Sequence, residues 1–352
     1  MGGCCTPRTC KRRAARGSEP LNRVLRALLA RHRDPVVILP YLGYGTARRA
    51  IVCGRVLEDE GFAGADRPER RLRNLAEFFK RFESDEVPHA KLFVSGEPVV
   101  SDREGYFHAE LAGRFKAGWN DIAVELAGRP EVRAIARVLV PSSAARFGVI
   151  SDIDDTVVYS HVTRKLRMIL TVALSSARQR KPFAGVAAFY RALQAGVNPF
   201  FYVSKSPWNL YAPLAEYLEL QGLPAGPLLL RDFGWRMPKQ HKETAIADIL
   251  ATYPKLPFVL IGDSGEHDPE IYAGIVRRFK DRIRAIYIRS VHKDPARDRS
   301  IAKLIGEVAK AGCQLVLVPN TEMAAAHAAA ERLITVADLK KVRLDRDRDA
   351  RA

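Results

Sequence analysis

The sequence has few cysteines and no long apolar run. Its five cysteines are three near the start, Cys4, Cys5 and Cys10, and two far away, Cys53 and Cys313. Neither a disulfide framework nor a zinc site follows from that spacing. No stretch approaches the roughly 20 apolar residues that a membrane-spanning helix needs, and the N-terminus has no apolar signal-peptide core. We therefore expect a cytoplasmic protein in a reducing compartment, with peripheral contact at a membrane left open.

The sequence also has fewer acidic than basic residues. Lys and Arg number 57 against 40 Asp and Glu, which gives the 352-residue chain a formal net charge of +17. Such a charge attracts anions, so nucleic acid, acidic lipid headgroups and phosphorylated substrates all remain as partners. GC-rich genomes also encode basic chains that have no polyanionic partner. Charge alone therefore selects no partner, while an apolar content of 47% indicates a globular chain with a sizeable core.

Stretches of different composition divide the chain. Residues 1–20 are a basic tail, whose first six residues fit the N-myristoylation pattern, as short sequences also do by chance. Residues 21–145 begin with a basic amphipathic helix, which packs on its own domain or rests on an anionic membrane surface. A β-rich domain follows within the same range. Residues 146–340 alternate strands with helices, and residues 341–352 are a charged tail.

The β-rich part predicts a small antiparallel, sandwich-like domain. Short runs rich in β-branched and aromatic residues are separated by turn signals such as Gly43 and Gly45. A helix is expected over 66–82, where Arg, Leu and Glu prevail. Strands are expected at 36–39, 50–53, 89–94, 106–111, 121–126 and 134–140.

The part that follows predicts an α/β domain with a doubly wound parallel sheet. Near-continuous apolar runs have the composition of strands buried on both faces. Strands are expected at 147–150, 199–203, 257–261, 285–288 and 315–318, and helices at 163–180, 184–195, 210–221, 241–252, 268–279 and 300–311. Alternation of this kind places an active site at the carboxyl ends of the strands.

Polar residues follow three of these strands, at ends that the sheet would bring together. They are Asp152, Asp154, Asp155 and Thr156 after the first strand, Ser204 and Ser206 after the second, Lys242 at the start of a helix, and Asp263 and Asp268 after the third. Burying several carboxylates in one crevice is costly unless a cation compensates them. A hard divalent metal such as magnesium takes oxygen ligands and suits this set. Helix capping is the alternative for Ser204, Asp263 and Thr156 taken singly, but it does not explain the cluster of acids.

In this order the motifs resemble those of the haloacid-dehalogenase phosphohydrolases. Asp-x-Asp-x-Thr follows one strand and Ser the next, then come Lys and Gly-Asp-x-x-x-x-Asp, all within roughly residues 147–290. The longer strings at 151–156, 202–210 and 262–272 are similar to a narrower branch. This branch comprises the magnesium-dependent phosphatidate phosphatases whose yeast member associates with actin patches, together with bacterial relatives that carry a β-rich region before the catalytic part.

The resemblance implies a magnesium-dependent phosphoric monoester hydrolase. Asp152 would be the nucleophile that becomes an aspartyl-phosphate, and Asp154 would protonate the leaving oxygen and then activate water. Ser204 and Lys242 would hold the transferring phosphoryl group, and Thr156 completes the expected catalytic set.

The resemblance also implies the metal ligands. Magnesium would be bound by Asp152, by the backbone carbonyl of Asp154 and by Asp263, with room left for waters and a phosphoryl oxygen. Asp268 is expected either to orient a metal-bound water or to hold Lys242.

The expected substrate is an anionic phospholipid. The chain has little room for the large cap insertions that enclose small substrates in this superfamily, and the helix expected over 163–180 is basic and apolar. Hydrolysis of phosphatidate to diacylglycerol and phosphate is therefore the first hypothesis. The second is a phosphatase acting on a nucleic-acid end or a phosphoprotein. A third, of another class, is a scaffold or binding protein whose catalytic strings are vestigial.

Overall fold

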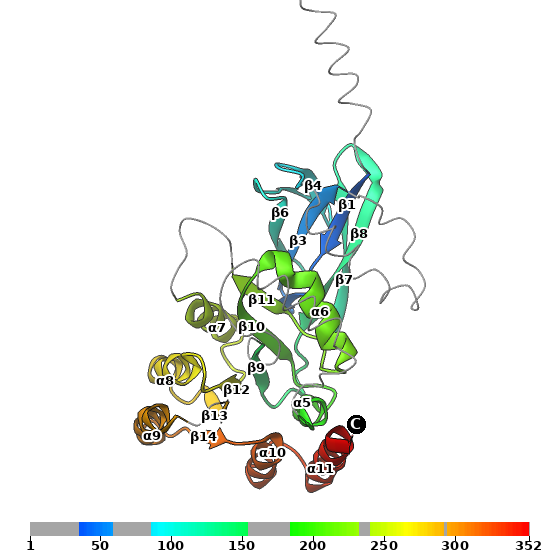
Figure 1. Ribbon diagram of the computed structural model, residues 1–352. Coiled ribbons are helices and arrows are strands. Elements are labelled where there is room, and N and C mark those ends of the chain that lie inside the picture. Colours follow the sequence, from blue (N-terminus) through cyan, green and yellow to red (C-terminus); the bar gives the residue numbers. More distant parts are fainter. Residues whose placement is uncertain (1–34, 59–85, 154–183, 232–239, 292–293, 352) are drawn as a thin grey trace, which may run out of the picture.

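A computed structural model of the chain describes residues 35–58, 86–153, 184–231, 240–291 and 294–351. Two sheets form the framework of this part, an eight-stranded sheet followed in sequence by a six-stranded one (Figure 1). The basic tail and the helices expected from residue 21, over 66–82 and over 163–180 lie outside the described residues.

The first sheet is mixed and mostly antiparallel, and it contains all six expected strands. Its order is β1-β3-β2-β8-β7-β4-β5, with β6 paired to the other side of β3, and only the β2–β8 pair is parallel. The strands are β1 (Val36–Pro40), β2 (Gly43–Thr46), β3 (Arg49–Glu58), β4 (Lys91–Val94), β5 (Glu97–Val100), β6 (Tyr106–Ala112), β7 (Gly118–Leu126) and β8 (Arg129–Val140). The β-rich domain expected before the α/β part is thus confirmed, with alternate residues such as Val52, Val124 and Val138 buried in its core.

Strands β2 and β5 were not expected, and β2 shows why. Gly43 and Gly45 indicate turns by residue type, yet both lie within β2. A Cβ atom on Gly45 would lie 2.2 Å from the carbonyl oxygen of Arg49, so only glycine permits this close pairing of β2 with β3.

The second sheet is parallel throughout, with the order β11-β10-β9-β12-β13-β14. Its strands are β9 (Gly148–Asp152), β10 (Phe200–Pro207), β11 (Leu228–Arg231), β12 (Phe258–Asp263), β13 (Ile283–Arg289) and β14 (Leu315–Val318). The chain order reverses at β9, which has β10 on one side and β12 on the other. Such a switch point leaves a crevice at the carboxyl ends of the strands. The predicted α/β doubly wound fold is confirmed, and β11 is an additional strand.

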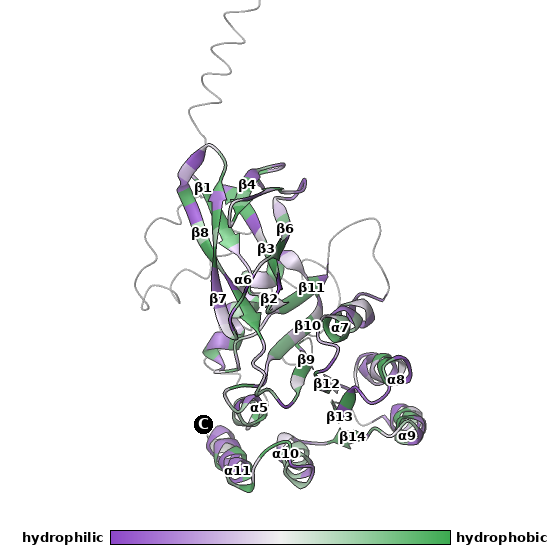
Figure 2. Ribbon diagram, turned by 180° about the vertical axis from the view of Figure 1, so that it is seen from behind, coloured by the Kyte–Doolittle hydropathy of each residue, from purple (hydrophilic) through white to green (hydrophobic). Residues whose placement is uncertain are grey.

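Helices cover both faces of the parallel sheet (Figure 1). They are α5 (Val186–Gln194), α6 (Tyr211–Leu220), α10 (Thr321–Ala330) and α11 (Val336–Arg351) on one face, and α7 (His241–Thr252), α8 (Asp268–Arg278) and α9 (Pro295–Lys310) on the other. Each face has its own apolar core. Figure 2 shows the reason in the sequence: β11 is mostly hydrophobic, whereas β8 alternates between hydrophobic and hydrophilic residues.

The C-terminal residues differ from the expected charged tail. Residues 341–351 form the last turns of α11, in which Val342 is fully buried. The backbone N–H of Gly185 donates a hydrogen bond of 3.0 Å to Asp349 Oδ2, which ties α11 to the start of α5. Because most residues of α11 are charged, its sequence does not indicate a helix, although the helix has one apolar edge.

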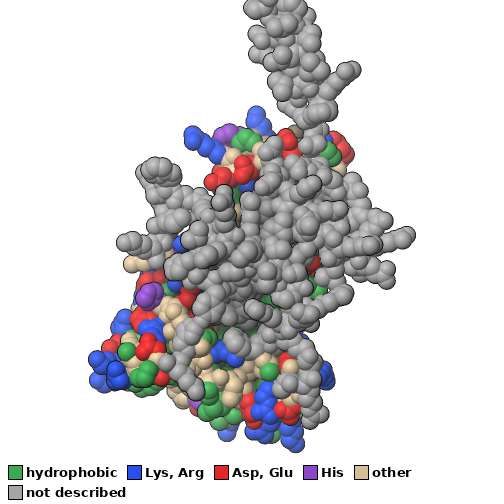
Figure 3. Space-filling model, in the orientation of Figure 1, with side chains coloured by type: hydrophobic (Ala, Val, Ile, Leu, Met, Phe, Trp, Pro, Cys, Tyr) green, Lys and Arg blue, Asp and Glu red, His purple; other side chains and the backbone are tan. Residues whose placement is uncertain are grey.

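The surface charge of the described part is mixed. On the face that Figure 3 presents, Lys and Arg side chains are interspersed with Asp and Glu over α8, α9 and α11. The net charge of +17 is therefore not gathered into one basic patch among the described residues of that face. No helix within the described ranges is both long enough and apolar enough to span a bilayer.

Candidate active site

The described residues expected to act together do converge at the carboxyl end of the parallel sheet. Asp152 is the last residue of β9 and Asp263 the last of β12. Ser204 lies one residue beyond Val203, the β10 partner of Asp152. Lys242 is in the first turn of α7, and Asp268 opens α8. Asp154, Asp155 and Thr156 lie outside the described residues.

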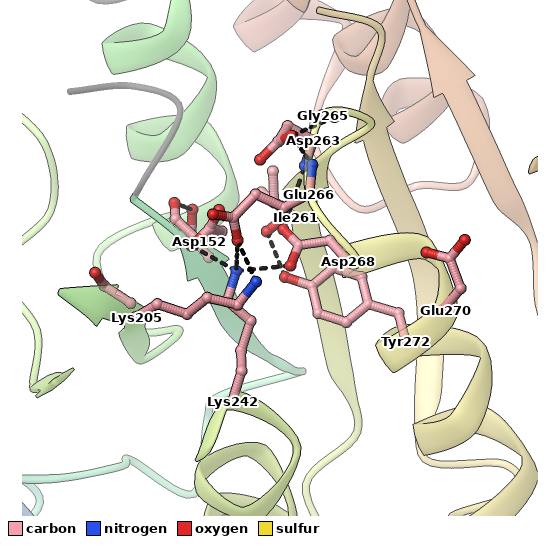
Figure 4. Close-up of polar contacts among 12 residues, drawn as sticks. Asp152, Lys205, Lys242, Ile261, Asp263, Gly265, Glu266, Asp268, Glu270 and Tyr272 are labelled. Atoms are coloured by element: carbon pink, nitrogen blue, oxygen red, sulfur yellow. Dashed lines mark hydrogen bonds and ion pairs between the residues drawn. The ribbon is translucent and has the colours of Figure 1, made fainter. Parts of the chain in front are cut away.

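A buried lysine links three carboxylates at this site (Figure 4). The ammonium nitrogen Nζ of Lys242 lies 2.6 Å from Asp268 Oδ1, 2.9 Å from Asp152 Oδ1 and 3.4 Å from Glu266 Oε2. The side chains of Lys242 and Asp152 are only 2% and 4% exposed. Because so little water reaches these charges, each depends on the others for compensation.

Asp268 is the most deeply buried of these acids. Burial raises the pKa of its carboxyl well above the usual value, and the neighbouring Asp152 carboxylate adds to that effect, while Lys242 opposes it. The backbone N–H of Asp263 donates to Asp268 Oδ2 over 3.4 Å. A Cβ atom on Gly262 would lie 2.3 Å from the same oxygen, so glycine at this position permits the carboxylate to approach β12. Of the two roles expected for Asp268, the contacts match the one in which it holds Lys242.

Asp263 is oriented by its own loop. Its Oδ1 accepts hydrogen bonds from the N–H groups of Gly265 at 2.6 Å and Glu266 at 3.0 Å. The helix that follows starts at Asp268, and its N-cap residue is His267, so Asp263 shapes the loop rather than capping the helix. Ser204 is not a helix cap either, because α6 has Leu210 at its N-cap and Ser204 Oγ accepts from Ser206 N–H at 2.9 Å.

Arg297, in the first turn of α9, holds the same loop from outside. Its Nε donates to the carbonyl of Ser264 at 2.9 Å and its Nη2 to the carbonyl of Glu266 at 2.6 Å. The guanidinium also forms a two-point ion pair with Glu270, in which Nη2 lies 3.0 Å from Oε2. Sequence reasoning missed this residue, because a single arginine in a helix carries no pattern.

Lys205 and Glu266 were also missed. Lys205 Nζ lies 2.8 Å from Glu266 Oε2, the oxygen that is 3.4 Å from Lys242 Nζ (Figure 4). Lys205 is 36% exposed and Glu266 22% exposed, so this pair lies at the edge of the site. A signal was present in the sequence, since both residues lie within the motif strings beside Ser204 and Asp263.

A cavity opens beside the two strand-end aspartates. Asp152, Asp263 and Arg289 line it together with apolar side chains of α5 and α10. Arg289 ends β13 and pairs in register with Asp263. Burial lowers the pKa of Arg289 to about 10, so its guanidinium still carries a positive charge at neutral pH. The cavity therefore offers both carboxylates and a cation to a ligand.

Tyr190, which lines this cavity, is hydrogen-bonded to β9. Tyr190 Oη lies 2.7 Å from Ser151 Oγ, and Ser151 Oγ donates to the carbonyl of Asp152 at 2.9 Å. Burial raises the pKa of Tyr190 to about 12, so the phenol stays neutral. This pair fixes the backbone at the end of β9.

Acidic groups suited to a divalent cation are present. Ligand oxygens of Asp152, Glu266 and Asp268 lie within 4.8 Å of one another. The ammonium of Lys242 contacts all three, however, so their shared charge is already partly compensated. Asp263 faces the cavity with Asp152 from the neighbouring strand, and carboxylate oxygens are the ligands that hard divalent metals prefer. The donor set fits such a metal.

Comparison with known proteins gives the same family as the motifs. Residues 147–290 match the family model described as "Phosphatidate phosphatase APP1, catalytic domain". The predicted resemblance to haloacid-dehalogenase-type phosphatases of this branch is confirmed over the segment that carries the motifs.

Two curated relatives and one solved structure are similar to parts of this chain. Phosphatidate phosphatase APP1 of Saccharomyces cerevisiae is 34% identical over 174 residues, which cover 46% of this chain and 29% of that protein. An uncharacterised protein of Schizosaccharomyces pombe is 29% identical over 153 residues, 42% of this chain and 25% of that protein. A crystal structure of a HAD family hydrolase from Deinococcus radiodurans, with bound phosphate and sodium, covers 54% of this chain and 99% of its own, at 21% identity and a TM-score of 0.30. The chain thus spans less than a third of the length of either curated relative.

Proposed function

We propose that this protein is a magnesium-dependent phosphatase that works through an aspartyl-phosphate and converts phosphatidate to diacylglycerol and phosphate. The observation that carries the proposal is the buried contact between Lys242 and Asp152, 2.9 Å long, at the switch point of the parallel sheet. A nucleophilic carboxylate must be held in place. Lys242 contacts Asp152 directly, and Asp268 fixes the lysine in turn.

The chemical steps are those that the family resemblance implies for these residues. A carboxylate oxygen of Asp152 attacks phosphorus, and the bond from phosphorus to the leaving oxygen breaks. Asp154, assigned from the resemblance alone, gives that oxygen a proton. It then takes a proton from the water that attacks the phosphorus of the aspartyl-phosphate, which frees phosphate and restores Asp152.

Ser204 and Lys242 hold the phosphoryl group during both steps. Ser204 lies beside Asp152 on the neighbouring strand, and Lys242 contacts the nucleophile directly. We assign Asp263, Asp152 and the carbonyl of Asp154 to the metal, which when bound would neutralise charge on the phosphoryl oxygens. Asp268 acts on Lys242 rather than on the metal. Thr156 stays in the proposed catalytic set on the resemblance.

The lipid substrate rests on the family match and on the exposed edge of the site. The yeast relative is named for phosphatidate hydrolysis. Lys205 lies at the solvent-facing edge, and its ammonium would attract an anionic headgroup to that side. A phospholipid in a membrane is too large to be enclosed, so a site reached from an exposed edge suits it.

Phosphate release from short-chain phosphatidate, measured with magnesium and with a chelator, tests the proposal. Activity is expected only with metal, and Asp152→Asn is expected to abolish it. Asp121→Asn is the matched control, because Asp121 is exposed in β7 of the first sheet. Hydrolysis of phosphorylated nucleic-acid ends or phosphopeptides, with none of phosphatidate, would reject the lipid substrate. Absence of all hydrolysis would reject the phosphatase and favour a binding protein.

A further inference from the structure

The segment Ser204–Ser206, which carries the proposed phosphate-binding serine, lies where the β-ladder is irregular. The pairing of β10 with β9 ends at Val203 and Asp152. On its other side, the register with β11 shifts between the pair Val203–Leu229 and the pair Pro207–Arg231. A regular ladder therefore does not define the positions of these three residues, and what holds Pro207 and the residues after it also determines where Ser204 lies.

The residues after Pro207 pack against the first sheet. Trp208 to Leu210 form a single 3-10 turn, and Tyr211 opens α6. Tyr41, in the connection between β1 and β2, stacks on both aromatic rings. Its ring centroid lies 3.8 Å from that of Tyr211 with an interplanar angle of 23°, and 5.3 Å from that of Trp208 with an angle of 4°.

Hydrogen bonds fix the same contact. The N–H of Leu42 donates to Tyr211 Oη over 2.6 Å, and the N–H of Tyr41 donates to the carbonyl of Cys53 in β3 over 2.8 Å. Tyr41 is 3% exposed and Tyr211 6% exposed. An aromatic stack that excludes water and is tied at both ends to the backbone restricts the 3-10 turn to one position.

A second contact joins the sheets nearby. Tyr253, just after α7, donates from its hydroxyl to the carbonyl of Gly45 over 3.0 Å. Tyr44 packs edge-on against Phe201 of β10, with ring centroids 5.8 Å apart. The β1–β2 region thus touches β10, which carries Ser204, and the residue that follows α7, the helix whose first turn carries Lys242.

We infer that Tyr41 and Leu42 are positioning residues, through which the β-rich sheet sets the geometry of the Ser204–Ser206 segment. The inference rests on the proposed function, since it gives Ser204 the phosphoryl group to bind. It assigns the β-rich sheet a part in catalysis without any contact to the substrate. Asp152 and Asp263 come from β9 and β12, so the metal ligands do not depend on this stack.

The test compares phosphate affinity with metal affinity in Tyr41→Ala. Inorganic phosphate binding in the presence of magnesium is measured by calorimetry, and the magnesium concentration for half-maximal activity is measured with p-nitrophenyl phosphate. A displacement of about 1 Å at a reacting group can cost about 100-fold, so we expect phosphate affinity and kcat/KM to fall about 10- to 100-fold. The half-activating magnesium concentration is expected to change less than about 2-fold. Tyr41→Phe keeps the stack, so its phosphate affinity and kcat/KM are expected to equal those of the wild-type protein.

Two further variants make the result decisive. Phe93→Ala removes a ring that is 42% exposed on the outer face of the same sheet, and it should leave phosphate affinity unchanged. Tyr211→Phe removes only the acceptor of the Leu42 hydrogen bond and should weaken phosphate binding with the fold retained, even if Tyr41→Ala does not fold. If Tyr41→Ala folds, an unchanged phosphate affinity in this variant overturns the inference. If it does not fold, an unchanged phosphate affinity in Tyr211→Phe overturns it. A loss of magnesium affinity as large as the loss of phosphate affinity also overturns it. A wild-type protein that neither binds phosphate nor hydrolyses any phosphomonoester overturns the proposed function as well.

Discussion

Replacing Lys242 by methionine tests whether the buried charges at the site depend on one another. Lys242 is 2% exposed, and its ammonium contacts Asp152, Asp268 and Glu266 within 3.4 Å. Lys242→Met keeps most of the side-chain volume but leaves the buried Asp152 and Asp268 without their cation. Removing one partner of a buried ion pair destabilises a protein by about 3–5 kcal/mol. We expect a loss of that size in the free energy of unfolding.

Urea denaturation followed by circular dichroism measures the effect in metal-free buffer. Lys255→Met is the control, because Lys255 is exposed after α7, and it should change stability by less than about 0.5 kcal/mol. The double variant Lys242→Met with Asp268→Asn should lose less than the sum of its two single variants, by about 1–3 kcal/mol. A loss below about 1 kcal/mol in Lys242→Met, or strict additivity in the double variant, would refute this reasoning.

Further predictions concern the edge of the site, its loop and the first sheet. Glu266→Gln removes the negative charge of the Lys205–Glu266 ion pair, so the KM for phosphatidate should change about 2- to 5-fold with kcat nearly constant. An unchanged KM would exclude this pair from substrate binding. In Arg297→Lys the lysine cannot make the same set of hydrogen bonds to the Asp263 loop, so the half-activating magnesium concentration should rise about tenfold or more. Arg299→Lys, at an exposed position of the same helix, should not alter this concentration. Gly45→Ala should lower the free energy of unfolding by about 1–3 kcal/mol, because its Cβ atom meets the Arg49 carbonyl. Gly306→Ala, in open space on α9, should raise the free energy of unfolding by about 0.5–1 kcal/mol. The opposite order would refute the close β2–β3 pairing.

The parallel sheet and its strand-end residues could be predicted from the sequence for a physical reason. Strands buried on both faces must be continuously apolar, so a polar residue directly after such a run marks the carboxyl end of a strand. Asp152 and Asp263 follow runs of this kind, and in a doubly wound sheet these ends meet. Placing Ser204 and Lys242 beside them needed only the order of the motifs.

The residues that hold the site in shape could not be predicted in the same way. Arg297 and Lys205 are single basic residues with no periodic context, and their partners lie 27 or more residues away in the chain. Only the folded chain shows that Arg297 contacts loop carbonyls and that Lys205 contacts Glu266. Only the folded chain likewise shows the contacts of Tyr41, because nothing in the sequence distinguishes it from any other aromatic residue beside a short strand.

Short or atypical elements account for the errors in secondary structure. β2, β5 and β11 have four residues each, and β2 contains two glycines, so neither length nor composition marked them as strands. α10 is rich in alanine and α11 in charged residues, which leaves little contrast between their faces. Packing against α5 and the sheet stabilises them, and such tertiary contacts do not appear in a local pattern.

Acid quenching during turnover shows most directly whether Asp152 becomes covalently phosphorylated. The protein is mixed with magnesium and phosphatidate that carries a radiolabelled phosphate, quenched at short times, digested and analysed by mass spectrometry. We expect a labelled acyl-phosphate on the peptide that contains Asp152, with none in Asp152→Asn and undiminished labelling in Asp121→Asn. Label on another residue, or steady phosphate release without any label on this peptide at any quench time, would contradict it.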